Sequence, residues 1–213
     1  MTVGSNLTRP RVAIVRTGLA NLASVLAGLR RAGADPYVTE AADDVVRESH
    51  VMLPGVGAFG PAMEMLNAHG IADPLRERIR DGRSTLCICL GQQLLANSSD
   101  ESPESAPGLG LVDRHVQRLP ASVRVPHFGW NLVEPAPGAR LLTKGYAYFA
   151  NSFCIATPPE GWTVATTQHG VRFVAAMERG NVLTCQFHPE LSGTWGLALL
   201  RRWLGTAEED CQC

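Results

Sequence analysis

The chain has 213 residues, of which 45% are hydrophobic and 18% charged, so it can bury a sizeable core and does not have the composition of a disordered segment. Its net charge of −1, with no basic block, argues against binding to nucleic acid or to an anionic membrane. No apolar run approaches the roughly 20 residues of a membrane helix, and the start of the chain lacks the apolar core of a secretory signal. We therefore expect a cytoplasmic protein with one domain at 11–205, between flexible segments at 1–10 and 206–213.

The first half of the chain alternates between strand and helix patterns. Asp73 is expected to cap a helix whose first position is Pro74. An alternation of this kind implies a parallel sheet with right-handed crossovers. The expected strands are 11–16, 37–39, 51–53 and 85–88, and the expected helices start at Asn21 and cover 61–69, 74–80 and 91–97.

From about Gly110 onwards, short alternating strands dominate, and one amphipathic helix at 194–204 ends the pattern. Arg179-Gly180-Asn181 is a hairpin turn signal. The fold class is therefore α/β, a mostly parallel sheet flanked by helices with an antiparallel β extension in the second half. The strands expected in this half are 112–118, 123–125, 130–133, 146–149, 163–167, 173–178 and 181–187.

The sharpest local motif is Cys87-Ile88-Cys89-Leu90-Gly91, where a strand meets a helix. A nucleophile at such a junction sits on a tight turn with its side chain exposed. The helix N-terminus behind it favours a thiolate, and backbone N–H groups at the turn can bind a developing oxyanion. A buried cysteine at the end of a strand explains the same five residues about equally well.

Two further motifs follow strands. His188 and Glu190, in Gln186-Phe187-His188-Pro189-Glu190, are expected at the carboxyl end of a strand, where open α/β sheets gather their active groups. A histidine there can take a thiol proton and return it to a leaving amine, while a carboxylate holds the imidazole tautomer. The glycines of Pro54-Gly55-Val56-Gly57 would let backbone amides approach a ligand. Taken singly, a surface histidine and an ordinary loop are the simpler interpretations.

Together these motifs resemble those of the class I (triad-type) glutamine amidotransferases, over about residues 12–204. Within that family the chain is most similar to the glutaminase subunits, HisH, of imidazole glycerol phosphate synthase. Pro126-His127-Phe128-Gly129-Trp130-Asn131 is the most discriminating stretch. The resemblance implies a flavodoxin-like sheet and hydrolysis of L-glutamine to glutamate and ammonia, with no cofactor or metal. It also implies a heterodimer with a (β/α)8-barrel cyclase subunit, which receives the ammonia and makes imidazole glycerol phosphate and AICAR in histidine biosynthesis.

The resemblance also implies a role for individual residues. Cys89 would attack the glutamine carboxamide, and His188, oriented by Glu190, would move the protons. The other implied positions surround the substrate: the oxyanion donors would come from Leu90, Gly55 and Val56, and glutamine would be held by Gln93, Glu101, Ser152 and Phe153.

Four positions depart from the family pattern, and they leave alternatives open. Cys87, Arg16, Asn151 and Leu191 stand where the family usually has Gly, Asp, His, and Lys or Arg. The chain could be a paralogue that supplies a different synthase, or a weakly catalytic scaffold subunit, although the intact triad argues against a scaffold. Cys87 could make the site sensitive to oxidants or simply fill the core. The Cys87-x-Cys89 pair and the six histidines show no paired metal-ligand spacing.

Overall fold

The computed structural model describes residues 9–17, 22–55, 57–102 and 107–206. Its main sheet has nine strands within these ranges, in the order β2-β1-β3-β4-β12-β11-β10-β7-β8. The first five are parallel to one another and follow a flavodoxin-like order, which confirms the expected α/β class. They are β1 (Arg11–Val15), β2 (Asp35–Thr39), β3 (His50–Leu53), β4 (Thr85–Ile88) and β12 (Val182–Cys185).

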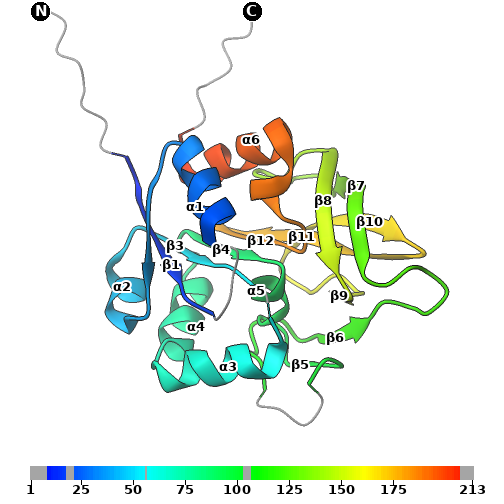
Figure 1. Ribbon diagram of the computed structural model, residues 1–213, viewed down its shortest axis with the longest axis horizontal. Coiled ribbons are helices and arrows are strands. Elements are labelled where there is room, and N and C mark those ends of the chain that lie inside the picture. The colour runs from blue at the N-terminus through cyan, green and yellow to red at the C-terminus, as the bar shows by residue number, and fades with distance from the viewer. Residues whose placement is uncertain (1–8, 18–21, 56, 103–106, 207–213) are drawn as a thin grey trace, which may run out of the picture.

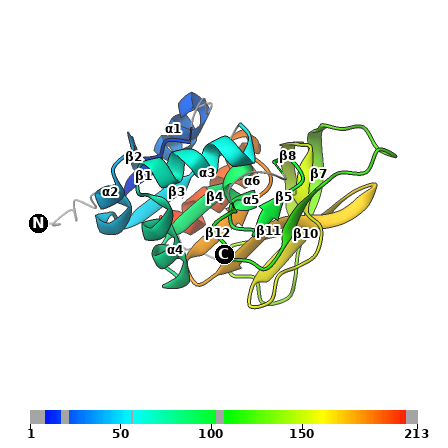
Figure 2. The same cartoon turned by 90° about the horizontal axis from the view of Figure 1, so that it is seen from below.

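The other four strands of the main sheet form the expected antiparallel extension (Figures 1 and 2). The turn at 179–181 joins β11 to β12, as the sequence predicts. These strands are β7 (His127–Pro135), β8 (Gly145–Asn151), β10 (Thr163–His169) and β11 (Val171–Arg179), and a separate small sheet holds β5 (Ser98–Ser99), β6 (His115–Arg118) and β9 (Phe153–Ile155).

Helices cover both faces of the parallel half of the sheet (Figure 1). One face packs against α1 (Leu22–Arg31) and α6 (Gly193–Leu204), and the other against α2 (Ala42–Arg47), α3 (Phe59–Ala68), α4 (Ala72–Arg80) and α5 (Leu90–Gln93). Each face buries its own apolar cluster, because successive strand residues point to opposite sides. No helix in the described ranges combines the length and the apolar character needed to cross a membrane.

Several element boundaries differ from the sequence-based expectations. α4 starts at Ala72 with Ile71 as its N-cap, so Asp73 lies in the first turn and the predicted cap is wrong. The helix expected over 91–97 ends at Gln93, because carbonyls at 94–96 accept hydrogen bonds from residues 109–112 instead of from a next helical turn. The segment 123–125 forms no strand, and the short helix α2 was not predicted.

The expected flexible ends fall mostly outside the described residues, as does the expected helix cap at Asn21. At the inner edges of these ends, the carbonyl of Pro10 accepts a hydrogen bond from the N–H of Asp35, and the Thr206 hydroxyl donates to the carbonyl of Ala32. The domain boundaries therefore stay a prediction.

Candidate active site

Cys89 occupies a sharp turn between β4 and α5. Its φ of 53° and ψ of −110° make it the one non-glycine residue with positive φ among the described residues. Such a backbone costs on the order of 1–3 kcal/mol and persists where surrounding packing imposes it. β4 is buried along its whole length, which fixes the strand side of the turn. The turn directs the thiol out of the sheet, as a nucleophile requires.

The glycine loop after β3 lies directly against this turn. A Cβ on Gly55 would collide with backbone atoms of Leu90 and Gly91, and a Cβ on Gly91 would collide with the carbonyl of Leu53. Glycine at both positions therefore lets two backbones approach closely. Leu90 is the first residue of α5, so its N–H has no intrahelical acceptor and is available beside Cys89. Val56 lies outside the described residues.

His188 follows β12 and pairs with Glu190, which lies in the short 3-10 helix η1 (Pro189–Leu191). The distance from His188 Nδ1 to Glu190 Oε1 is 2.8 Å, and both side chains are largely buried. Burial alone would lower the pKa of His188, but hydrogen bonds and charge interactions with Cys89 and Glu190 raise that pKa to about 10. The imidazole is therefore held as a cation between a thiol and a carboxylate.

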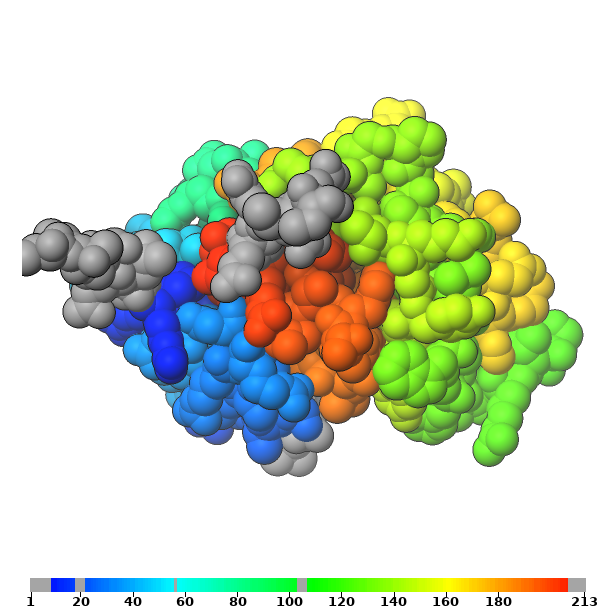
Figure 3. Space-filling view, turned by 90° about the horizontal axis from the view of Figure 1, so that it is seen from above, coloured from blue at the N-terminus to red at the C-terminus, as the bar shows by residue number. Residues whose placement is uncertain are grey.

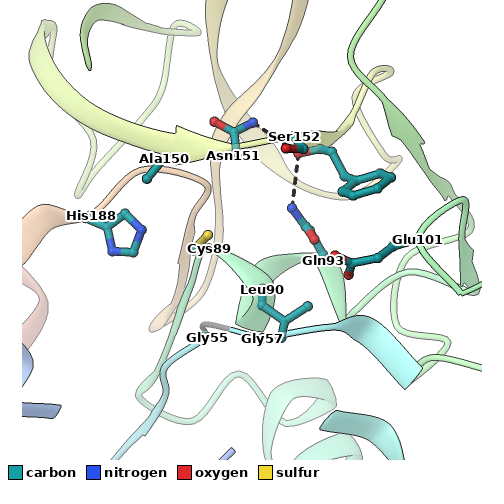
Figure 4. Close-up of a pocket in the computed structure, with 11 residues that line it drawn as sticks. Gly55, Gly57, Cys89, Leu90, Gln93, Glu101, Ala150, Asn151, Ser152 and His188 are labelled. Carbon is teal, nitrogen blue, oxygen red and sulfur yellow. Dashed lines mark hydrogen bonds between the residues drawn. The ribbon is translucent and has the colours of Figure 1, made fainter. Parts of the chain in front are cut away.

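Cys89 and His188 face a cavity of about 230 Å³ (Figure 4). This is smaller than the roughly 300–1,000 Å³ of sites for drug-sized ligands, so it suits a small metabolite. Gln93 and Glu101 lie on the far side of Cys89 from His188 in the same view. The cavity is lined by Gly55, Gly57, Cys89, Leu90, Gln93, Glu101, Ala150, Asn151, Ser152, Phe153 and His188.

Gln93 and Glu101 each form hydrogen bonds to the protein with some of their polar atoms, and each keeps one oxygen without such a bond within the described ranges. Gln93 uses both N–H bonds of its amide, to Phe153 O at 3.1 Å and to Gln186 Oε1 at 2.9 Å. One oxygen of Glu101 accepts the N–H of Phe59 at 2.8 Å, where α3 lacks a side-chain cap of its own. The remaining oxygens of Gln93 and Glu101 make no further hydrogen bond to the described residues, so the cavity offers acceptors on this side.

The structure also places the four departures from the family pattern. Burial raises the pKa of the Cys87 thiol to about 12, and Cys87 packs in the core cluster on the α3–α4 side of the sheet, whereas Cys89 belongs to the cluster on the other side. This favours a core-filling role for Cys87.

The other three departures lie nearer the surface of the site or outside it. Asn151 lines the cavity, but its side-chain nitrogen donates a hydrogen bond to the carbonyl of Phe153. Arg16, which follows β1, forms an exposed ion pair with Glu40. Leu191 is 41% exposed.

Sequence reasoning gave no role to Gln186 or Ser192, which the structure places against the proposed catalytic residues. Gln186 is fully buried and its amide lies 3.6 Å from Cys89 Sγ. The Ser192 hydroxyl donates to the carbonyl of His188 and accepts the N–H of Tyr148. The sequence signal that could have identified Gln186 is an uncharged polar residue directly after an apolar strand and next to the His188 motif. In the parts of the chain that the structure describes, no group of three or more His, Cys, Asp or Glu residues could hold a metal ion.

Comparison with known proteins agrees with this arrangement. Residues 20–204 match the class-I glutamine amidotransferase family. The HisH subunit of imidazole glycerol phosphate synthase from Symbiobacterium thermophilum is 40% identical over 197 residues, which cover 91% of this chain and 92% of that one. The imidazole glycerol phosphate synthase hisHF of Arabidopsis thaliana is 38% identical over 91% of this chain but only 34% of its own length.

A solved glutamine amidotransferase shares the fold, with a TM-score of 0.71 at 22% identity over 92% of this chain and 97% of that one. The family match over residues 20–204, together with sequence identity across nearly the full length, shows that the chain belongs to the class-I glutamine amidotransferases, among the HisH subunits of imidazole glycerol phosphate synthase.

Proposed function

We propose that this chain hydrolyses L-glutamine to glutamate and ammonia at the Cys89 cavity. The observation that supports the proposal best is the thiol of Cys89 and the imidazole of His188 at one cavity, with His188 linked both to Cys89 and to the carboxylate of Glu190. A cysteine paired with a histidinium is an activated nucleophile for acyl transfer. The chain needs no cofactor for this chemistry.

The mechanism has two halves. Cys89 Sγ forms a bond to the carboxamide carbon of glutamine, and the oxyanion is bound by the N–H of Leu90 and by an amide of the Gly55–Val56 loop. His188 gives its proton to the departing ammonia, which leaves a γ-glutamyl thioester. Water then attacks the thioester carbon while His188 removes a proton, and the thiolate departs to release glutamate.

The opposite side of the cavity would hold the amino-acid end of the substrate. The free oxygens of Gln93 and Glu101 are acceptors, which suits an α-ammonium group. The backbone at Ser152 and Phe153 lines the same side and would contact the remaining polar groups. In this arrangement the carboxamide of a bound glutamine would lie next to Cys89.

An exposed apolar face beside the site is the proposed docking surface for the (β/α)8-barrel cyclase subunit. Phe128, Trp130 and Tyr146 are 56–65% exposed on one side of β7 and β8, and Leu191 is the last residue of η1, just before α6. Figure 3 shows that β7 and β8 adjoin α6 on this side of the molecule. Clustered apolar side chains in water mark interaction sites. The N–H of His188 donates to the carbonyl of Tyr148, so this face directly adjoins the triad.

Two further features support the assignment. The Arabidopsis relative extends far beyond the region matched by this chain, which is consistent with a synthase that needs additional parts to use the ammonia. The described free thiols suit a reducing compartment such as the cytoplasm: they are Cys87, Cys89, Cys154 and Cys185.

The chemistry of ammonia gives a reason for a docked partner. Ammonia is protonated in water at neutral pH and then no longer acts as a nucleophile, so a docked partner that excludes water would keep it reactive.

The test is to measure glutamine-dependent and ammonia-dependent synthesis by the complex with the barrel subunit. Cys89→Ser should abolish the glutamine-dependent reaction and leave the ammonia-dependent reaction unchanged, because serine does not provide a thiolate. Cys154→Ala removes another buried thiol and should retain both activities. Glutamine-dependent turnover that persists in Cys89→Ser would remove Cys89 from the mechanism, and a wild-type complex without glutaminase activity would support the scaffold alternative.

A further inference from the structure

Gln186 connects the proposed nucleophile to the proposed substrate-binding side of the cavity. Its side chain is fully buried, directly after β12. Its Oε1 accepts a hydrogen bond from Gln93 Nε2 at 2.9 Å, and its Nε2 donates to Cys89 Sγ at 3.6 Å, a separation that suits the large sulfur atom. The backbone N–H of Gln186 donates to the carbonyl of Ala175, so the residue is fixed at both its main chain and its side chain.

The direction of this chain of hydrogen bonds is set by a backbone group. The carbonyl of Phe153 can only accept, and it faces the same Gln93 nitrogen that faces Gln186. If the Gln93 amide were inverted, its oxygen would face the Phe153 carbonyl, so that two acceptors would meet without a proton between them. Gln186 must therefore present its oxygen to Gln93 and its N–H bonds to Cys89. An amide held this way can donate to the sulfur and cannot exchange its oxygen and nitrogen.

From this geometry we infer that Gln186 is a positioning residue that acts on both sides of the site. Its N–H stabilises the Cys89 thiolate, in addition to the imidazolium of His188, because hydrogen bonds to the charged form of a group favour that form. Its oxygen fixes the orientation of the Gln93 amide, so that Gln93 Oε1 stays turned to the cavity as an acceptor. The inference rests on the proposed function only for what the cavity binds; the effect on the thiolate is independent of it.

Two substitutions separate these two effects. Gln186→Glu keeps an oxygen acceptor for Gln93 but places a second oxygen, which carries negative charge, against the sulfur. Gln186→Met has nearly the same shape and removes both hydrogen bonds. The primary measurement is the rate at which iodoacetamide alkylates Cys89 at pH values from 6 to 10. Mass analysis of the Cys89 peptide gives the extent of alkylation. This readout requires no glutaminase activity, so it can fail or succeed independently of the proposed function.

We expect both variants to lower the alkylation rate of Cys89 at neutral pH by about tenfold, and to move the pH midpoint of alkylation upward by about one unit. In the glutaminase assay of the complex with the barrel subunit, Gln186→Glu should lower kcat with little change in KM. Gln186→Met should also raise KM severalfold, because the Gln93 amide is then free to rotate.

Gln92, which precedes Gln93 on α5, provides a matched control for Gln186. It is also fully buried, and its amide makes two hydrogen bonds, to the carbonyl of Val174 and to the hydroxyl of Thr184, neither of which involves the cavity. Gln92→Met should leave the alkylation midpoint of Cys89 at the wild-type value. Wild-type alkylation midpoints in both Gln186 variants would overturn the inference, as would an equal shift in Gln92→Met. If Gln186→Met does not fold, Gln186→Glu decides the question about the thiolate.

Discussion

At the scale of single residues, the environment of each histidine decides what it can do. His188 lies between Cys89 and Glu190, and their hydrogen bonds outweigh the effect of burial on its pKa. His127 is also buried, but it stacks on His169 with ring centroids 3.9 Å apart and on Phe149. No carboxylate of the described residues contributes to its pKa. Burial and the charge of His169 lower the pKa of His127 to about 4. One imidazole is thus a cation at neutral pH and the other is neutral.

The pairing of His188 with Glu190 predicts an order of effects in the triad. His188→Ala deletes the group that moves protons and should lower kcat by about 10²–10⁴-fold. Glu190→Gln keeps the imidazole and a hydrogen-bonding group, so it should lower kcat by less than His188→Ala, because it disturbs the orientation of the imidazole and does not delete it. Glutaminase rates of the two variants in the complex with the barrel subunit are the measurement. Equal or greater loss in Glu190→Gln would contradict this order.

The neutral His127 predicts a loss of stability in mild acid. Its folded pKa of about 4 lies below the unfolded value of 6.5, so the unfolded chain binds a proton between these values while the folded chain does not. Its contribution to stability is therefore complete above pH 6.5 and is lost as pH falls toward 4. His127→Phe should reduce the stability lost between pH 7 and 4.5 by about 2–3 kcal/mol, measured by urea denaturation. An unchanged loss would show that His127 does not titrate in this way.

At the scale of elements, one buried cation joins the helical layer to the sheet. Arg78 of α4 is 1% exposed, and burial lowers its pKa to about 10, so it remains charged at neutral pH. Its guanidinium donates to a side chain at the start of β4 and to backbone carbonyls at the end of α2, at the start of β3 and before β4. These acceptors are the Thr85 hydroxyl and the carbonyls of Val45, Glu48, Ser49 and Ser84.

Arg78→Lys should destabilise the fold by about 2–4 kcal/mol, since an ammonium has three donors in place of five and leaves buried carbonyls without partners. Arg80→Lys is the control, because Arg80 lies on the same helix with its side chain exposed. The free energy of unfolding in urea is the measurement. A cost for Arg78→Lys no larger than that for Arg80→Lys would mean that the guanidinium network contributes little.

At the scale of the whole molecule, the sheet has two distinct ends. The parallel end is covered by helices on both faces, and β7 and β8 lie at the antiparallel end (Figure 2). There the two strands present exposed aromatic side chains beside the proposed triad. Leu191 is also exposed and lies in η1, which contacts β8, at the position where the resembling family usually has a basic residue. The composition of the face favours an apolar contact over an ion pair at this point.

Leu191→Lys should therefore weaken binding to the cognate barrel subunit by about tenfold, because the lysine would lose its hydration without gaining a counter-ion. Val46→Lys is the matched control: Val46 is also an exposed apolar residue, but it lies on α2 at the other end of the sheet. Affinity can be measured by titration calorimetry. Tighter binding would show that the partner carries an acidic residue here, and unchanged affinity would place Leu191 outside the interface.

The sequence by itself determined the α/β class, most of the strands and helices and the proposed triad, because these depend on local patterns. Apolar runs specify strands, and Cys89 and His188 both follow such runs, so a parallel sheet brings them to the same edge. The roles of Gln93 and Glu101 followed only from the family resemblance, since polar residues on a helix and in a loop have no local signature.

The tertiary structure alone decided the features that depend on groups far apart in the chain. The end of α5 at Gln93 is set by hydrogen bonds from residues 109–112, and the side of the sheet to which Cys87 points is set by the layers packed on it. The link from Phe153 through Gln93 and Gln186 to Cys89 joins three separate segments, around α5, at β9 and after β12. No local propensity encodes such a link, because each amide takes its orientation from partners that only folding brings within hydrogen-bonding distance.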